Sequence, residues 1–123
     1  MYTYRAEVVK VVDGDTIDVD IDLGFEVWVR NVRLRLNRID AYETRLYKGT
    51  TEEEKELGLK AKAYLQQQFD DNPTQVYVNT KEKGKYGRWI AEVEIRRDAD
   101  DIQPLNMSDA LVSLGYAVYK DYR

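Results

Sequence analysis

A run of eight residues near the amino terminus alternates between polar and apolar side chains, which predicts a β-strand. The run is Asp15-Thr16-Ile17-Asp18-Val19-Asp20-Ile21-Asp22, and residues two apart in a strand share a face. The three apolar residues of the run then point inward, and the aspartates that follow each of them point to water. Asp15 falls on the inward row, where a carboxylate is costly unless a cation or hydrogen bonds compensate it. We therefore expect Asp15 either to lie at a solvent-exposed opening of the fold or to contact a positively charged group.

The composition limits the chemistry that the chain can perform. A length of 123 residues with 43% hydrophobic side chains predicts a single domain, residues 1–123, with one core. A net charge of −4 argues against binding nucleic acid by bulk electrostatics, although a local basic site is compatible with it. The chain has no cysteine and no histidine, which excludes disulfides, thiol catalysis and imidazole ligands. Carboxylates could still hold a hard cation such as calcium or magnesium.

The sequence carries no membrane or secretion signal. No apolar run approaches the roughly 20 residues that a bilayer-spanning helix requires. The start, Met1-Tyr2-Thr3-Tyr4-Arg5, lacks the apolar segment of a signal peptide. We therefore expect no membrane contact and a cytoplasmic protein, unless a leader was removed.

The pattern of alternation, capping residues and turn residues predicts three strands, a helix, two strands and a second helix. The strands are expected at about Tyr4–Val12, Thr16–Leu23, Glu26–Ile39, Gln75–Thr80 and Arg88–Arg96, and the helices at about Glu52–Phe69 and Met107–Leu114. This order is α+β and mostly β, and it fits a barrel of five bent strands closed by two helices. The OB-fold is the commonest barrel of this kind.

Local signals refine these elements. Thr51, with Glu54 three residues later, predicts the start of the first helix, and Asn106 predicts the start of the second. The alternation of the long third strand slips, and a bulge near Asn37-Arg38 would keep both apolar sets inside. In the last strand we expect an inner row made of Trp89, Ala91, Val93 and Ile95.

Three clusters of residues could carry chemistry, and each has a structural alternative. Asp13-Gly14-Asp15-Thr16 could be only a hairpin turn. The charged stretch from Arg33 to Arg45 could be a surface strand with ion pairs, or a site where arginines bind phosphate and carboxylates bind a metal or water. The stretch from Lys81 to Arg88 could be a soluble hairpin tip, or a phosphate clamp with an aromatic platform. The aspartates after Asp15 are too widely spaced along one strand for a compact cation shell.

Taken together, these clusters resemble motifs of the staphylococcal nuclease-like (thermonuclease) family. The resemblance rests on Val12-Asp13-Gly14-Asp15-Thr16, on Arg35 followed by Asp40-Ala41-Tyr42-Glu43-Thr44, on Lys85-Tyr86-Gly87-Arg88, and on the second helix with Gly115-Tyr116-Ala117. It covers nearly the whole chain in order. One departure is Ala41-Tyr42, where the family usually has Thr-Pro.

The resemblance implies an OB-fold barrel that hydrolyses phosphodiester bonds of DNA and RNA with calcium. It implies that Asp15, Asp40 and the carbonyl of Ala41 bind the calcium ion, and that Glu43 activates or orients the attacking water. Arg35 and Arg88 would bind the scissile phosphate, and Tyr86 and Lys85 would contact the nucleotide. The expected substrates are single-stranded or denatured DNA and RNA, and the protein is expected to be a monomer.

Two other classes of function remain open from the residues. The chain could be an OB module that holds nucleic acid or a protein without cutting it. It could also be a scaffold or inhibitor protein whose arginines only form ion pairs.

Overall fold

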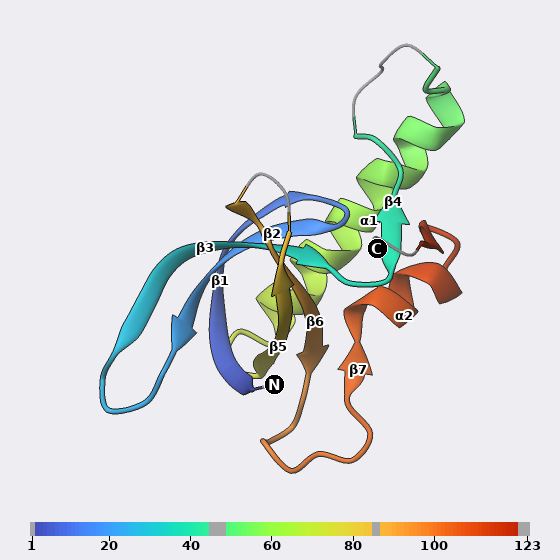
Figure 1. Cartoon of the computed structure of the whole chain (residues 1–123). Coiled ribbons are helices and arrows are strands. Elements are labelled where there is room, and N and C mark those ends of the chain that lie inside the picture. Colours follow the sequence, from blue (N-terminus) through green and yellow to red (C-terminus); the bar gives the residue numbers. More distant parts are fainter. Residues whose placement is uncertain (1, 45–48, 85–86, 121–123) are drawn as a thin grey trace.

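The computed structural model describes residues 2–44, 49–84 and 87–120. Figure 1 shows the helices and strands of these residues, coloured in order from the amino terminus to the carboxyl terminus. They are β1 (Thr3–Asp13), β2 (Thr16–Asp22), β3 (Trp28–Leu36), β4 (Ile39–Ala41), α1 (Glu52–Asp71), β5 (Val76–Lys83), β6 (Trp89–Ile95), β7 (Leu105–Asn106), α2 (Met107–Ser113) and β8 (Ala117–Tyr119).

Five strands form a closed barrel, which confirms the predicted OB-fold. The strand order is β3-β2-β1-β5-β6, and β6 returns to pair with β3, so that the sheet closes. All neighbours in the barrel are antiparallel except the closing pair, β3 and β6, which is parallel. The short β7 extends the sheet beyond β6, and β4 pairs with β8 in a separate ribbon.

The alternation of β2 sorts its side chains as the sequence predicts. Ile17, Val19 and Ile21 are buried in the barrel. On the outer face, Asp18 pairs with Arg33, and Asp20 pairs with Arg30. These aspartates are therefore neutralised by arginines of β3 and do not form a shared cation site.

One residue of the expected inner row of β6 stays partly exposed to solvent. Ala91 and Val93 are buried and Ile95 packs against the core, but Trp89 is 39% exposed. Trp89 is the first residue of β6, and the register of β5 slips by one residue opposite the next step, where Thr80 faces Ala91 and Glu82 faces Ile90. In the parallel pair Trp89 lies opposite the buried Leu34, so it keeps the phase of the inner row, and its exposure reflects its place at the end of the strand.

The long third strand that the sequence predicts is two strands. β3 ends at Leu36, and the chain turns at Asn37 and Arg38 before β4 begins at Ile39. Arg38 has a φ of 69°, in the left-handed region that non-glycine residues seldom adopt. The turn, rather than a bulge, lets both Leu36 and Ile39 be fully buried.

Both helices begin where the capping residues predict. The Thr51 side chain accepts a hydrogen bond from the Glu54 amide, and the Asn106 side chain accepts one from the Asp109 amide. Helix α1 buries Ala61, Leu65 and Phe69 against the barrel. Helix α2 ends before Gly115, whose φ of 80° suits a helix terminus. No helix within residues 2–44, 49–84 and 87–120 has the length and apolarity to cross a membrane.

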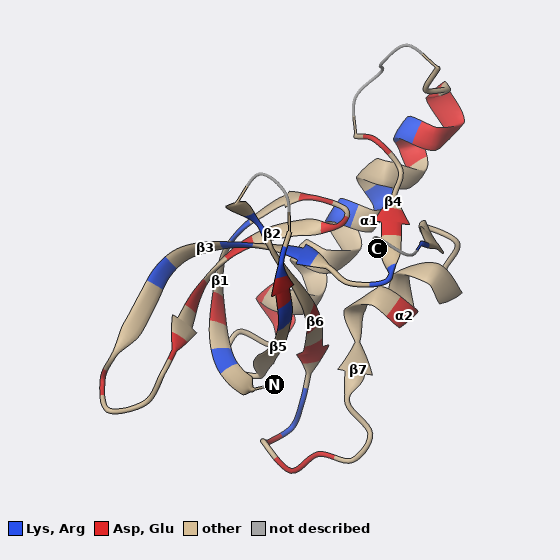
Figure 2. Cartoon of the chain, viewed as in Figure 1, with Lys and Arg blue, Asp and Glu red and all other residues tan. Residues whose placement is uncertain are grey.

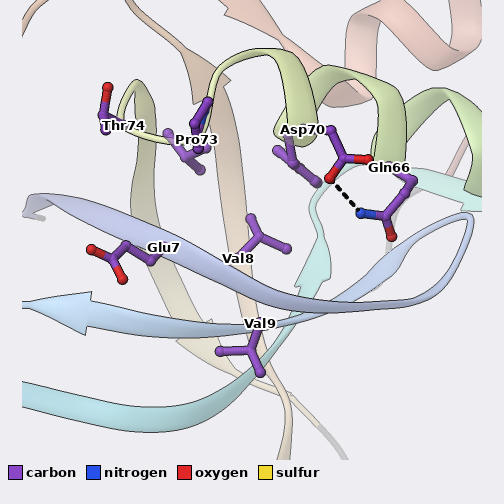
Figure 3. Close-up of a pocket in the computed structure, with 9 residues that line it drawn as sticks. Glu7, Val8, Val9, Gln66, Asp70, Pro73 and Thr74 are labelled. Atoms are coloured by element: carbon purple, nitrogen blue, oxygen red, sulfur yellow. Dashed lines mark hydrogen bonds between the residues drawn. The ribbon is translucent and has the colours of Figure 1, made fainter.

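Charges of both signs are spread over the barrel and the helices (Figure 2). The first turn of α1 is acidic, with Glu52, Glu53 and Glu54, which suits the positive end of the helix dipole. A groove of 350 Å³ lies between β1 and the last turn of α1, lined by Val8, Val9, Phe69 and Pro73, with Glu7 and Asp70 at its sides (Figure 3). None of the residues that line this groove is among the site residues that the sequence predicts.

Candidate active site

Asp15 lies at the tip of the β1–β2 hairpin and is only 5% exposed. Its carbonyl accepts a hydrogen bond of 2.8 Å from the Leu36 amide, which fixes the hairpin against the end of β3. One carboxylate oxygen, Oδ1, accepts from the Thr16 hydroxyl at 3.1 Å. The other, Oδ2, accepts from the Ala41 amide at 3.0 Å and lies 2.8 Å from Arg35 Nη1. The positive group expected opposite Asp15 is therefore Arg35.

Arg35 bridges two carboxylates that come from different elements. Its Nη1 contacts Asp15, and its Nη2 donates to Asp40 Oδ1 at 3.1 Å. The Arg35 side chain is only 14% exposed, so these charges interact with little screening by water. The sequence alone could not establish this bridge, because Asp15 and Arg35 are brought together by the pairing of β2 with β3.

A fourth charged group, Lys120, reaches the same site. Its Nζ lies 3.6 Å from Asp40 Oδ2, and its backbone follows β8, the partner of β4. Lys120 was missed because no motif marks it. The antiparallel pairing of Asp40 with Val118 brings Lys120 close to the Asp40 carboxylate.

The environment of Asp15 raises its pKa from 3.8 to about 6. Burial is the largest cause, and a side-chain hydrogen bond with Asp13 adds to it. The charge of Arg35 and the Ala41 amide act in the opposite direction and only partly offset the rise. Asp13 belongs to the motif that the sequence shows, yet its effect on the neighbouring carboxylate became visible only with the hairpin folded. Its Oδ1 also accepts from the Asp15 amide at 3.2 Å.

Close packing at two glycines holds the segment that follows Asp40 against the hairpin and α1. A Cβ added at Gly14 would lie 2.9 Å from Ala41 Cβ and 2.8 Å from Ala61 Cβ. A Cβ added at Gly58 would meet the carbonyl oxygens of Tyr42 and Glu43. Both glycines therefore serve close packing. The sequence offers a signal for the role of Gly58. A glycine inside a predicted helix costs about 1 kcal/mol relative to alanine, so it calls for a packing reason.

Glu43 lies on this packed segment, and its side chain is exposed. The bridge of Asp15, Arg35 and Asp40 does not extend to the Glu43 carboxylate. Its backbone nevertheless lies against Gly58 of α1, two residues beyond Ala41. This places Glu43 at the border of the cluster and open to solvent.

Arg88 lies just before β6, the strand that closes the barrel by pairing with β3. In the parallel pair, Leu34 faces Trp89 and Arg35 faces Ile90, so Arg88 comes one position before the residue opposite Leu34. The Arg88 carbonyl accepts a 2.6 Å hydrogen bond from the Gly84 amide, which ties the two sides of the β5–β6 connection together. The residues Lys85 and Tyr86, predicted to contact substrate, lie outside the described residues.

The oxygen donors at this site suit a hard cation in type. Asp15 and Asp40 converge on one guanidinium group, which marks a position where the fold favours positive charge. Within the described ranges, no three acidic side chains gather into a metal-binding group. Two carboxylates with one backbone carbonyl would leave most of the coordination of a calcium ion to water or substrate.

The match of residues 33–123 to a family model, with the closed OB barrel, supports a nuclease-type or nucleic-acid-binding module. Residues 33–123 match the family model described as "Staphylococcal nuclease homologue". The chain belongs to the staphylococcal nuclease-like family, which confirms the resemblance seen in its motifs.

Two curated relatives extend this comparison. The chain is 35% identical over 130 residues to "Uncharacterized protein MJ1439" of Methanocaldococcus jannaschii, covering 93% of this chain and 58% of that protein. It is 32% identical over 115 residues to "Protein ParB" of Escherichia coli, covering 92% of this chain and 55% of that protein. The chain therefore spans a little over half the length of each of these relatives.

Proposed function

We propose that this protein is a calcium-dependent nuclease that hydrolyses phosphodiester bonds of DNA, RNA or both. The observation that carries the proposal is the convergence of Asp15 and Asp40 on Arg35, at the end of a barrel of the nuclease-like family. Hydrolysis of a phosphodiester requires positive charge at the phosphate oxygens, a positioned water and a base. The residues around this cluster include candidates for each requirement.

In this proposal, Asp15, Asp40 and the carbonyl of Ala41 hold the calcium ion. When bound, calcium would supply positive charge for the phosphate and a site for water. Arg35 and Arg88 bind the scissile phosphate and stabilise the charge of the transition state, which planar guanidinium groups do well. Both terminal nitrogens of Arg35 contact these carboxylates, so an ion bound by Asp15 and Asp40 would compete for those oxygens and would release the guanidinium toward the phosphate.

Glu43 is the proposed base or water-orienting residue. Its exposed carboxylate is open to solvent and substrate, while its backbone is held against Gly58. Lys85 and Tyr86 are proposed to contact the nucleotide. The substrates are proposed to be single-stranded or denatured DNA and RNA, cut by a monomer with one domain.

Cleavage of denatured DNA tests this proposal. We expect cleavage in calcium, none in excess chelator, and a rate about 10²–10⁴-fold lower in Glu43→Gln, the range for loss of a general base. Glu53→Gln is the matched control, because it makes the same chemical change on an exposed glutamate in the first turn of α1 and should cleave normally. Equal cleavage under all these conditions would contradict the proposal.

A binding module without cleavage is the second candidate. The contacts of Arg35 favour it, because this arginine already neutralises the charges of Asp15 and Asp40 and an ion is then less needed. Calcium titration distinguishes the two candidates. DNA binding without calcium binding at millimolar concentrations would support the module.

A further inference from the structure

The turn between β3 and β4 determines where Asp40 lies relative to Arg35. Only Leu36, Asn37, Arg38 and Ile39 separate the two site residues. Arg38 adopts a φ of 69°, in the left-handed region that is unfavourable for a residue with a Cβ. Such a turn persists only when surrounding contacts hold it.

Glu92 of β6 provides the central contact. Its Oε2 accepts hydrogen bonds from Arg38 Nε at 2.9 Å and Asn37 Nδ2 at 2.8 Å. Its Oε1 accepts from Arg38 Nη2 at 2.9 Å and Asn106 Nδ2 at 3.0 Å. One carboxylate, 13% exposed, therefore binds both residues of the turn and Asn106, the N-cap residue of α2. Charge-assisted, bidentate bonds of this kind are strong and directional.

Backbone contacts hold the same turn from the other sides. The Asn37 amide donates to the Ala91 carbonyl at 2.9 Å, and the fully buried Ser108 hydroxyl donates to the Asn37 carbonyl at 2.8 Å. The Lys120 amide donates to the Arg38 carbonyl at 2.8 Å. Three elements, β6, α2 and the end of β8, thus meet at the turn.

A second carboxylate completes the arrangement around Arg38. Asp109 of α2 accepts from Arg38 Nη1 at 2.9 Å and from the Tyr119 hydroxyl at 2.8 Å. The Arg38 guanidinium also lies 5.9 Å from the centre of the Tyr119 ring. Two carboxylates, those of Glu92 and Asp109, therefore bind the Arg38 guanidinium and fix its direction.

We propose that Glu92 is a positioning residue for the active site, because it holds the Asn37–Arg38 turn so that Asp40 and the Ala41 amide meet Asp15. This inference rests on the proposed function for its catalytic consequence. Glu92 does not belong to the acid–arginine cluster, which is Asp15, Arg35 and Asp40, and it acts through Arg38. Its loss should move β4 away from the β1–β2 hairpin while the barrel stays closed.

Hydrogen exchange at the Ala41 amide measures this position directly, because that amide donates to Asp15 Oδ2 at 3.0 Å. In Glu92→Gln, measured without calcium or nucleic acid, we expect Ala41 to exchange at least about tenfold faster relative to the amides of β5. The calcium concentration for half-maximal cleavage should rise by a similar factor. A purely structural role would instead accelerate Ala41 and β5 together.

Glu94→Gln is the matched control. Glu94 lies on the same strand and pairs with Arg96 at 2.6 Å, and its carboxylate, 17% exposed, is buried about as well as that of Glu92, so the variant loses an ion pair of a similarly buried carboxylate away from the turn. It should leave both the relative exchange of Ala41 and the calcium dependence unchanged. Unchanged relative exchange in Glu92→Gln, or an equal effect in Glu94→Gln, would overturn the inference.

Arg38→Gly keeps the test decisive if Glu92→Gln does not fold. Glycine adopts a φ of 69° without strain, so this variant removes the guanidinium and leaves the turn conformation accessible. We expect the same faster exchange at Ala41, and an unchanged rate would refute the role of the contact. Because exchange needs no catalysis, a wild-type protein that cuts nothing would refute the proposed function and leave this result interpretable.

Discussion

Replacing Asp15 with asparagine should stabilise the calcium-free protein at neutral pH. The pKa of Asp15 rises from 3.8 to about 6 on folding, chiefly because the carboxylate is buried. Each unit of pKa corresponds to about 1.4 kcal/mol, so the folded state disfavours the ionised form by about 3 kcal/mol. Asparagine has nearly the shape of the neutral acid and avoids this penalty. The variant should therefore unfold with a free energy about 3 kcal/mol higher above roughly pH 7.

The pH dependence gives the sign of the effect. A raised folded-state pKa means that folding takes up a proton between pH 3.8 and about 6, so the wild type loses stability as pH rises through that interval. The advantage of Asp15→Asn should vanish below pH 3.8 and reach its full size above about 6. Urea denaturation in chelator, repeated across this range, measures the difference.

Asp20→Asn supplies a control of opposite sign. The Asn31 amide and Arg30 lower the pKa of the Asp20 carboxylate, so its ionised form stabilises the fold and its loss should destabilise it at neutral pH. If Asp15→Asn proved no more stable than the wild type above about pH 7, the reasoning would be wrong. The ion pair with Arg35 would then outweigh the cost of burial.

Two further substitutions test the packing and the charge of the site. Gly58→Ala should destabilise the protein by about 1–3 kcal/mol and slow cleavage, because the new Cβ would meet the Glu43 carbonyl at 2.5 Å; a gain in stability, as helix propensity alone predicts, would contradict this. Arg35→Lys should lower the cleavage rate about 10²–10³-fold, because one ammonium lacks the fork that contacts both carboxylates. Arg33→Lys, on the exposed face of β3, should cleave like the wild type, and equal losses in both lysine variants would refute the special role of Arg35.

Local sequence patterns predicted the elements whose residues interact with near neighbours along the chain. The alternation of β2 and the caps at Thr51 and Asn106 are of this kind, since period and capping depend on residues a few positions apart. The barrel also followed from the order of these elements. The short strands β4, β7 and β8 were not predicted, because two or three residues are too few to show a period.

The contacts of the site depend on residues that are distant in sequence. The alternation predicted that Asp15 faces inward, but its bond to the Ala41 amide joins residues 26 positions apart. Glu92 contacts Arg38 across 54 positions, and its position in β6 resembles that of any outward-facing acid on a strand. Such features require the tertiary register, which one sequence does not contain.

The two aspartates of the site are held by different parts of the molecule. Asp15 is fixed by the barrel, through the hairpin and the end of β3, whereas Asp40 lies on a ribbon outside the barrel that pairs with β8. The bonds of Glu92 and Ser108 link that ribbon's turn to β6 and α2. The distance between the aspartates therefore depends on how α2 docks, even though α2 contributes no side chain to the acid–arginine cluster. Any variant that loosens α2 should weaken the convergence on Arg35 before it opens the barrel.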